Sequence, residues 1–192
     1  MPDIDLSANR QAVKWTKREL LVRLLWELAQ PLFRWSPRPL WGWRRWLLKR
    51  FGARVGACAN IFPSARIMIP WNLEIGDWGA IGESAIIYNL ARIKLGRATT
   101  VSQYAHLCAG SHDYADPALP LLKPPITVGD QVWICAEAFV GPNVSIGEGA
   151  VVGARSVVVR DVAAWTVVAG NPANAIKART LRTSVQTAIG SS

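Results

Sequence analysis

Over much of the chain beyond residue 54, an aliphatic residue recurs at every sixth position. Fifteen such positions form five groups of three: Val55, Ile61, Ile67; Ile75, Ile81, Ile87; Leu95, Val101, Leu107; Val128, Ile134, Val140; and Ile146, Val152, Val158. A small side chain stands two residues before most of them, and in a strand those two positions share a face. Each coil can then bury its apolar side only by stacking on the next coil. The pattern predicts a mainly β protein, a parallel β-helix of about five three-sided coils.

The six-residue spacing breaks only between groups, with two extra residues before Ile75, two before Leu95 and fifteen before Val128. All insertions therefore leave from one corner of the coil, and the longest is the loop 108–127. Glycine directly follows eight of the fifteen aliphatic residues, and we expect it to supply a turn conformation that L-residues resist. An ordinary sandwich of short strands would not keep so strict a period.

Residues 12–50 have another pattern, in which Trp, Leu and Arg are interleaved. It predicts two helices broken by Pro31, Pro37 and Pro39. Five leucines share one helical face: Leu20, Leu21, Leu24, Leu25 and Leu28. After Val168 the repeats end, and Pro172 is expected to begin a short helix that covers the open end of the stack. We therefore divide the chain into a helical segment (1–52), a β-helix (53–170) and a helical cap with tail (171–192).

The net charge of +9 is concentrated in residues 10–54, which hold twelve Lys and Arg against two acids. A basic segment rich in Trp and Leu fits peripheral contact with an anionic membrane. The alternative is that its leucine face packs on the first coil and covers the strand edges there. No helix-turn-helix, zinc or RNA-binding signature accompanies the basic patch, so nucleic-acid binding is not expected.

No apolar run reaches the roughly 18–20 residues that span a bilayer, and the first residues do not resemble a secretory signal. Three scattered cysteines, Cys58, Cys108 and Cys135, form no CxxC pair and fit reduced thiols. We expect a cytoplasmic protein, with residues 12–50 as the segment that would lie on the inner face of the cytoplasmic membrane.

Three stretches of sequence resemble a known family: PWNLEIGD at 70–77, AGSHDY at 109–114, and the run from VGDQVWICAEAF to GNPANAIK at 128–177. The chain resembles the hexapeptide-repeat acyltransferases, and within them the colanic-acid-biosynthesis type of O-acetyltransferase, related to galactoside and maltose acetyltransferases. The resemblance implies a left-handed β-helix, a homotrimer, and acetyl-CoA as the donor of an acetyl group. It also implies a sugar or lipid-linked saccharide as acceptor, in exo- or surface-polysaccharide biosynthesis.

Only two histidines, His106 and His112, can serve as a general base at neutral pH. His112 lies in the long loop, where the family has its catalytic histidine, and is the preferred candidate. Asp113 follows it directly and is a candidate for orienting the ring. His106 comes directly before Leu107, which places it on the outer face of the coil as a surface residue and as the second candidate.

The resemblance also suggests residues for the two substrates. For acetyl-CoA they are Trp133, Ala136, Ala154, Val159, Arg160 and Lys177. For the acceptor they are Asn89 and Tyr114, although Asn89 would equally suit a turn and Trp133 would equally suit packing between subunits. The chain departs from the family at Cys135, where a glycine is usual beside the thioester, and at Asn174, where a basic residue often contacts phosphate. No metal is expected, because two histidines do not supply the zinc ligands of the β-helix carbonic anhydrases.

Two alternatives to sugar O-acetylation remain open on the sequence. The same fold can acetylate serine, an antibiotic or an amino-sugar nitrogen. It can also act as a repeat scaffold without catalysis.

Overall fold

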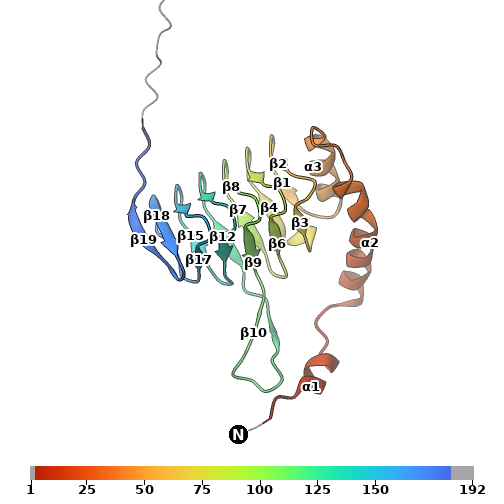
Figure 1. The fold of residues 1–192 in the computed structure, drawn as a ribbon. Coiled ribbons are helices and arrows are strands. Elements are labelled where there is room, and N and C mark those ends of the chain that lie inside the picture. Colours follow the sequence, from red (N-terminus) through yellow and green to blue (C-terminus); the bar gives the residue numbers. More distant parts are fainter. Residues whose placement is uncertain (1–2, 183–192) are drawn as a thin grey trace, which may run out of the picture.

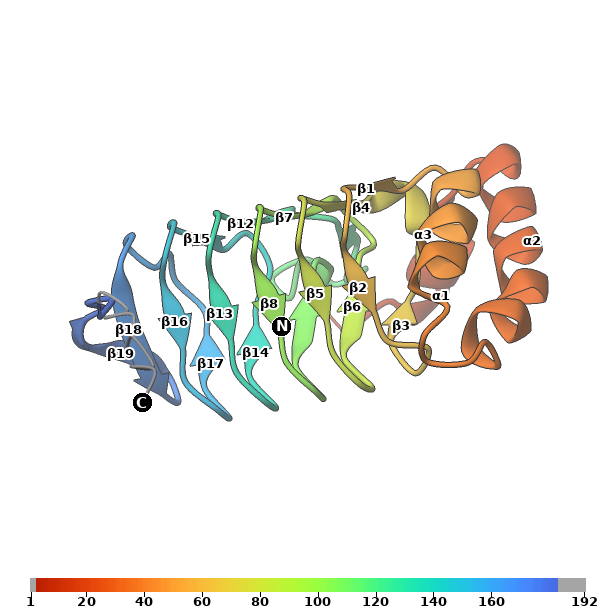
Figure 2. The same ribbon diagram turned by 90° about the horizontal axis from the view of Figure 1, so that it is seen from above.

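The structure is a computed structural model that describes residues 3–182. The chain winds into a stack of three-sided coils, with helices over one end and a hairpin at the other (Figures 1 and 2). Each side of the stack is a sheet whose strands run parallel and follow one another once per coil, except for one antiparallel strand added at the C-terminal end of the stack. This architecture fits a left-handed parallel β-helix, as predicted.

The three sheets, here called A, B and C, each take one strand from every coil. Sheet A contains β1 (Arg54–Val55), β4 (Leu73–Ile75), β7 (Ile93–Leu95), β12 (Ile126–Val128) and β15 (Ser145–Ile146). Sheet B contains β2 (Asn60–Ile61), β5 (Ala80–Ile81), β8 (Thr100–Val101), β13 (Trp133–Ile134), β16 (Val151–Val152), β18 (Thr166–Gly170) and β19 (Ala173–Ala178). Sheet C contains β3 (Arg66–Ile67), β6 (Ile86–Tyr88), β9 (His106–Cys108), β14 (Phe139–Val140) and β17 (Val157–Val158).

The six-residue period predicts these strands correctly. All fifteen aliphatic residues lie in the strands β1–β9 and β12–β17 and are buried in one continuous core. A sixth, incomplete coil follows, which the period did not indicate. In it Val162 bridges to Ile146 and β18 pairs with β16.

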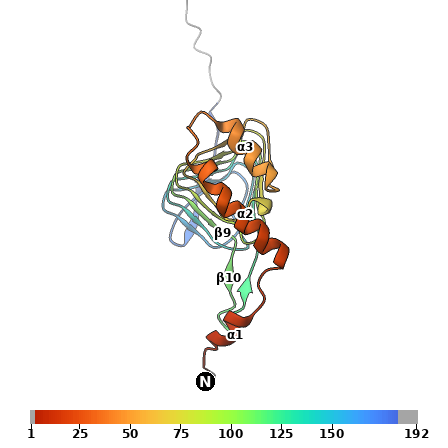
Figure 3. The same cartoon turned by 90° about the vertical axis from the view of Figure 1, so that its right-hand side faces the viewer.

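All insertions leave from the corner between sheets C and A, as predicted. The first is the 3₁₀ turn η1 (Pro70–Asn72), the second is the connection from β6 to β7, and the third is the long loop after β9. The loop carries a small antiparallel hairpin of β10 (Ser111–His112) and β11 (Leu121–Leu122). It projects from the side of the stack (Figure 3).

The expected role of the glycines is wrong. Gly76 has no positive φ; instead the residue three places after the aliphatic one does, as in Trp78 (φ 60°) and Ala98 (φ 54°). Glycine is needed for another reason: a Cβ on Gly76 would lie 2.6 Å from the backbone nitrogen of Arg97 on the next coil. At the corner between sheets A and B, successive coils therefore approach more closely than a Cβ permits.

The N-terminal segment forms α1 (Leu6–Gln11), α2 (Lys17–Arg34) and α3 (Trp41–Arg50). The chain breaks at Pro37–Pro39 as predicted, but α2 continues through Pro31. Pro31 leaves unpaired only the carbonyl of exposed Glu27, which water can reach, so the helix tolerates it near its end. Helix α1 was not predicted. No helix in residues 3–182 is long and apolar enough to cross a membrane.

Helix α2 does not use its leucine face to cover the first coil, contrary to the packing alternative. The opposite face, with Trp26, Ala29 and Phe33, is buried, and the Trp26 indole donates to the Ile67 carbonyl at 2.9 Å. The leucine row comprises Leu20, Leu21, Leu24, Leu25, Leu28 and Leu32, and each side chain is 48–69% exposed. Its apolar surface faces outward, away from the coils.

The short helix predicted from Pro172 is wrong for residues 173–178, which form β19 antiparallel to β18. The edge of the last full strand would otherwise present unpaired backbone groups, and a hairpin satisfies them. A helix of so few residues would have had to form against the cost of nucleation. Residues 183–192 of the predicted cap lie outside the described residues.

Candidate functional site

The long loop presents His112 at the end of β10, close to where the loop leaves the stack. Its hairpin is held by pairing of Ser111 with Leu122 and of His112 with Leu121. The His112 side chain is exposed. Its Nδ1 lies 2.6 Å from the backbone carbonyl oxygen of Leu119.

This hydrogen bond determines which nitrogen of the neutral ring carries the hydrogen. A carbonyl oxygen only accepts hydrogen bonds, so Nδ1 must carry the hydrogen and donate it. Nε2 of the neutral imidazole is then left with its lone pair, the form that can remove a proton from a hydroxyl group. The sequence could not indicate Leu119, because its backbone carbonyl is a group that every residue has.

Asp113 does not occupy the orienting position suggested for it. Its Oδ1 accepts from the N–H of Ala115 at 3.0 Å, and its own N–H donates to the Pro120 carbonyl at 3.1 Å. The carboxylate therefore stabilises the turn after β10, while Leu119 holds the ring. Tyr114, the next residue, is 93% exposed on the same turn.

His106 is not the surface residue that the sequence predicted. Its ring meets Tyr88 and Phe139 edge-on, at centroid distances of 6.4 and 5.3 Å, and Nε2 is buried without a partner in the described part of the chain. Burial lowers the pKa of His106, because a charged ring loses solvation there. With Nε2 buried, that nitrogen of the half-buried ring is not open to an acceptor hydroxyl.

Three of the residues suggested for acetyl-CoA lie on sheet B and at its corner with sheet C. Trp133 on β13 is half-exposed, and its indole donates to Ser102 Oγ at 2.9 Å. Ala136 and Ala154 follow β13 and β16 at equivalent places on successive coils, where the N–H of Arg155 donates to the Ala136 carbonyl.

Backbone N–H groups at that corner are available to a ligand. At the corner between sheets A and B, the equivalent N–H groups of Ala57 and Arg97 donate to the carboxylates of Asp77 and Asp130. No acceptor for the N–H of Ala136 or Ala154 occurs within residues 3–182. Such groups can bind the amides and the thioester oxygen of an acyl-CoA.

The other donor candidates lie elsewhere. Val159 and Arg160 are exposed just after β17, at the corner from which the His112 loop leaves, and Lys177 is exposed on β19. A single chain therefore does not gather all six donor residues around His112.

The departure from the family at Cys135 leaves its turn in the same conformation as the turns of the neighbouring coils. The turn at Cys135 places Glu137 at φ 59°, as the turns of the coils before and after place Tyr104 (58°) and Arg155 (57°). Burial raises the pKa of the Cys135 thiol. Asn174 is exposed, with its amide donating to the Pro172 carbonyl.

Asn89 is fully buried, and both ends of its amide are used inside the protein. Its Oδ1 accepts from the N–H of Ile69 at 2.9 Å, and its Nδ2 donates to the carbonyl of the same residue. It joins two successive turns at the insertion corner. In this arrangement its side chain offers no surface to an acceptor.

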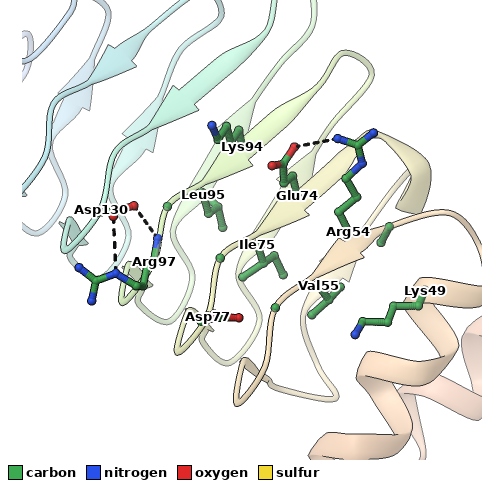
Figure 4. A pocket seen from close by; sticks show the side chains of 14 residues that line it. Lys49, Arg54, Val55, Glu74, Ile75, Asp77, Lys94, Leu95, Arg97 and Asp130 are labelled. Carbon is green, nitrogen blue, oxygen red and sulfur yellow. Dashed lines mark hydrogen bonds and ion pairs between the residues drawn. The ribbon is translucent and has the colours of Figure 1, made fainter.

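A shallow depression of about 610 Å³ lies on sheet A, between the end of α3 and Asp130, and His112 is not among the residues that line it (Figure 4). Two of its acidic residues pair with its arginines: Glu74 with Arg54, and Asp130 with Arg97. No group of three His, Cys, Asp or Glu residues able to hold a metal occurs in the part of the chain that the structure describes.

The sequence matches the family model of the bacterial transferase hexapeptide (six repeats) over residues 125–160. It is 41% identical over 158 residues to WcaF of Escherichia coli K12, whose name describes it provisionally as a colanic acid biosynthesis acetyltransferase. The match covers 82% of this chain and 87% of that protein.

Solved structures with the same fold include a maltose O-acetyltransferase from Clostridium difficile 630, with a TM-score of 0.79 and 23% identity, covering 86% of this chain and 90% of that one. Another is a hexapeptide-repeat acetyltransferase of Vibrio cholerae O1 biovar eltor complexed with acetyl coenzyme A, with a TM-score of 0.80 and 23% identity. That match covers 88% of this chain and 92% of the other.

Proposed function

The chain belongs to the hexapeptide-repeat transferase family, and from that premise we propose that it transfers the acetyl group of acetyl-CoA to a sugar hydroxyl, with His112 as the general base. The observation that carries the proposal is the bond from His112 Nδ1 to the Leu119 carbonyl. It leaves the lone pair on Nε2 of an exposed side chain, on a loop beside a regular stack of coils.

The reaction needs one proton to move twice. Nε2 of His112 takes the proton of the acceptor hydroxyl as its oxygen forms a bond to the thioester carbon. The tetrahedral intermediate then breaks its C–S bond, and the CoA sulfur receives the proton from the imidazolium. The Leu119 carbonyl stabilises that imidazolium, because it accepts from Nδ1 throughout.

For acetyl-CoA, the proposed contacts are the six donor residues described above. The N–H groups of Ala136 and Ala154 suit the pantetheine amides and the thioester oxygen. Arg160 and Lys177, both exposed cations, suit the phosphates. Trp133 and Val159 would supply apolar surface. The acetyl-CoA complex of the Vibrio cholerae structure supports an acyl-CoA as the ligand of this fold.

For the acceptor, the names of the relatives support a sugar, in the polysaccharide pathway suggested by the name of WcaF. Tyr114 stays in the proposed acceptor site, because it is exposed on the turn next to His112. We leave Asn89 out of that site, since its amide is buried against Ile69.

We further propose that the active protein is a homotrimer in which a second copy completes each site. Within one chain, the loop that carries His112 leaves the stack at the corner between sheets C and A, whereas Trp133 faces outward from sheet B. The outward row of sheet C presents the apolar side chains Ile86, Phe139 and Val157, together with His106 and, on the first coil, Arg66, and its apolar part suits an interface. Light scattering should give about three times the 21.0 kDa mass of the chain, and the mass of one chain would contradict a trimer.

We propose a peripheral membrane position for the leucine row of α2. Its exposed leucines lie between cations such as Arg18, Arg23 and Arg34, a combination that suits an anionic lipid surface. The enzyme would then meet a lipid-linked saccharide at the surface where such a saccharide is held.

Thiol release from acetyl-CoA tests the proposed activity. The assay would use a panel that includes maltose and methyl β-galactoside, together with serine, chloramphenicol and glucosamine. We expect acetyl-CoA to raise the melting temperature by mass action and CoA to appear with a sugar hydroxyl as acceptor. Release with serine, chloramphenicol or the glucosamine nitrogen alone would contradict the sugar hydroxyl. No thermal shift and no release would contradict the enzyme and favour a scaffold.

A further inference from the structure

Helix α1 lies against the tip of the His112 loop, more than 100 residues away along the chain (Figures 1 and 3). The side chain of Asn9, on this helix, reaches the loop. Its Nδ2 donates to the carbonyl of Ala118 at 2.8 Å and to the carbonyl of Leu119 at 2.6 Å. The second of these is the carbonyl that also accepts from His112 Nδ1.

The orientation of the Asn9 amide follows from its partners. Lys14 Nζ, which can only donate, lies 2.8 Å from Oδ1, and the two carbonyls, which can only accept, lie near Nδ2. The Leu119 oxygen has two lone pairs and uses them for two N–H donors, one from the N-terminal helix and one from the candidate base. Asn9 and His112 are therefore coupled through a single atom.

Leu119 needs such support, because its backbone has φ 45°, in the left-handed region that non-glycine residues rarely adopt. Within the loop it is fixed by its N–H, which donates to the Asp116 carbonyl at 2.9 Å. From outside the loop, Leu119 is held by α1 through the hydrogen bond from Asn9.

Further contacts tie the same segment to the loop. The N–H of Asp5 donates to the Pro117 carbonyl at 2.8 Å. Lys123, at the other end of the loop, donates to the Lys14 carbonyl at 2.8 Å and sits over the Trp15 ring at 3.5 Å. The loop is thus held at its tip and at its return strand by residues that precede α2.

We propose that Asn9 is a positioning residue for His112, acting through the Leu119 carbonyl to fix the Nδ1–H form of the ring. The inference rests on the proposed function of His112 as the base. It assigns the N-terminal helix a part in the reaction, in addition to covering the loop. Without the Asn9 donor, the Leu119 peptide can rotate, and the ring loses the partner that fixes its protonated nitrogen.

The kinetic test replaces Asn9 by Asp, which keeps the size and the Lys14 partner but cannot donate to a carbonyl. The matched control is Gln11→Glu, the same amide-to-carboxylate change on the same exposed helix. We expect Asn9→Asp to lower kcat about tenfold or more, with KM for acetyl-CoA within about twofold of wild type. Asn9→Ala should likewise lower kcat with little change in KM, and Gln11→Glu should resemble wild type in both. An unchanged kcat in both Asn9 variants would overturn the proposal.

A second readout does not depend on turnover. Nitrogen chemical shifts of ¹⁵N-labelled histidine report which ring nitrogen carries the hydrogen, and a His106→Gln spectrum assigns the two histidines. We expect His112 to show the Nδ1–H form in wild type and in Gln11→Glu, and to lose it in Asn9→Asp. Retention of that form in Asn9→Asp would overturn the proposal even if the protein turned over no sugar. Conversely, loss of the form without any acetyl transfer would support the coupling while contradicting the proposed function.

Discussion

Two histidines six residues apart have opposite surroundings in this protein. His112 is exposed and donates Nδ1–H to a carbonyl, whereas His106 is enclosed by Tyr88 and Phe139. The sequence could nominate His112, because only two histidines exist and one lies in the loop of a recognisable motif. It could not predict the partner of either ring, since those partners are a backbone carbonyl and aromatic rings from neighbouring coils.

The half-buried ring of His106 predicts a pH dependence of stability. Burial lowers its pKa in the folded protein below the unfolded value near 6.5, so below that pH the unfolded chain binds more protons. Stability should therefore fall as pH drops from about 7.5 to 5.5, and His106→Gln should make that fall shallower. Thermal melts of both proteins across this range check the prediction. Equal slopes would show that His106 does not contribute.

At the level of the element, the coil corners depend on two separate backbone requirements. At the corner between sheets A and B, one residue of each turn adopts a positive φ, and the glycine directly after the sheet A strand must lack a Cβ because the next coil is too near. The sequence period predicted the strands, the groups of three and the insertion corner, since burial alone dictates them. The period did not predict why glycine is needed at these positions, because the distance between coils is not encoded in the spacing along one coil.

Two glycine-to-alanine substitutions distinguish the effect of close approach between coils on stability from the effect of helix propensity. Gly76→Ala should destabilise the protein by about 3 kcal/mol, because its Cβ would fall 2.6 Å from Arg97 N. Gly42→Ala, on the exposed side of α3, meets only the Arg45 guanidinium at 3.8 Å and should stabilise by about 0.5–1 kcal/mol. Urea unfolding measures both. Similar effects from the two changes would contradict the account of the corners.

At the level of the whole molecule, the two ends of the stack are covered differently. Residues of α2 and α3 join the core of the first coil, and β19 pairs with the edge of the last one. The pattern of residues 12–50 predicted helices there, but not which face would be buried. Periodicity identified a leucine row and could not tell that tryptophan and phenylalanine, on the other face, fit the end of the coil.

Binding to vesicles tests the proposed use of that leucine row. Wild type should sediment with vesicles of phosphatidylcholine and phosphatidylglycerol, and a Leu24→Gln, Leu28→Gln double variant should sediment several-fold less. The control is Leu122→Gln, a change to an exposed leucine on the loop. Salt should weaken binding, because cations flank the row. Equal sedimentation of all three proteins would contradict a membrane role for α2.

The role of His112 in acetyl transfer from acetyl-CoA is tested most directly by comparing kcat for sugar acetylation in wild type, His112→Ala and His106→Ala. Removal of a general base typically costs about 10²–10⁴-fold, so we predict a loss of at least about 100-fold in His112→Ala. His106→Ala should keep most of its turnover, because Nε2 of His106 is buried between coils and is not open to an acceptor hydroxyl. Near-normal turnover in His112→Ala would contradict the mechanism.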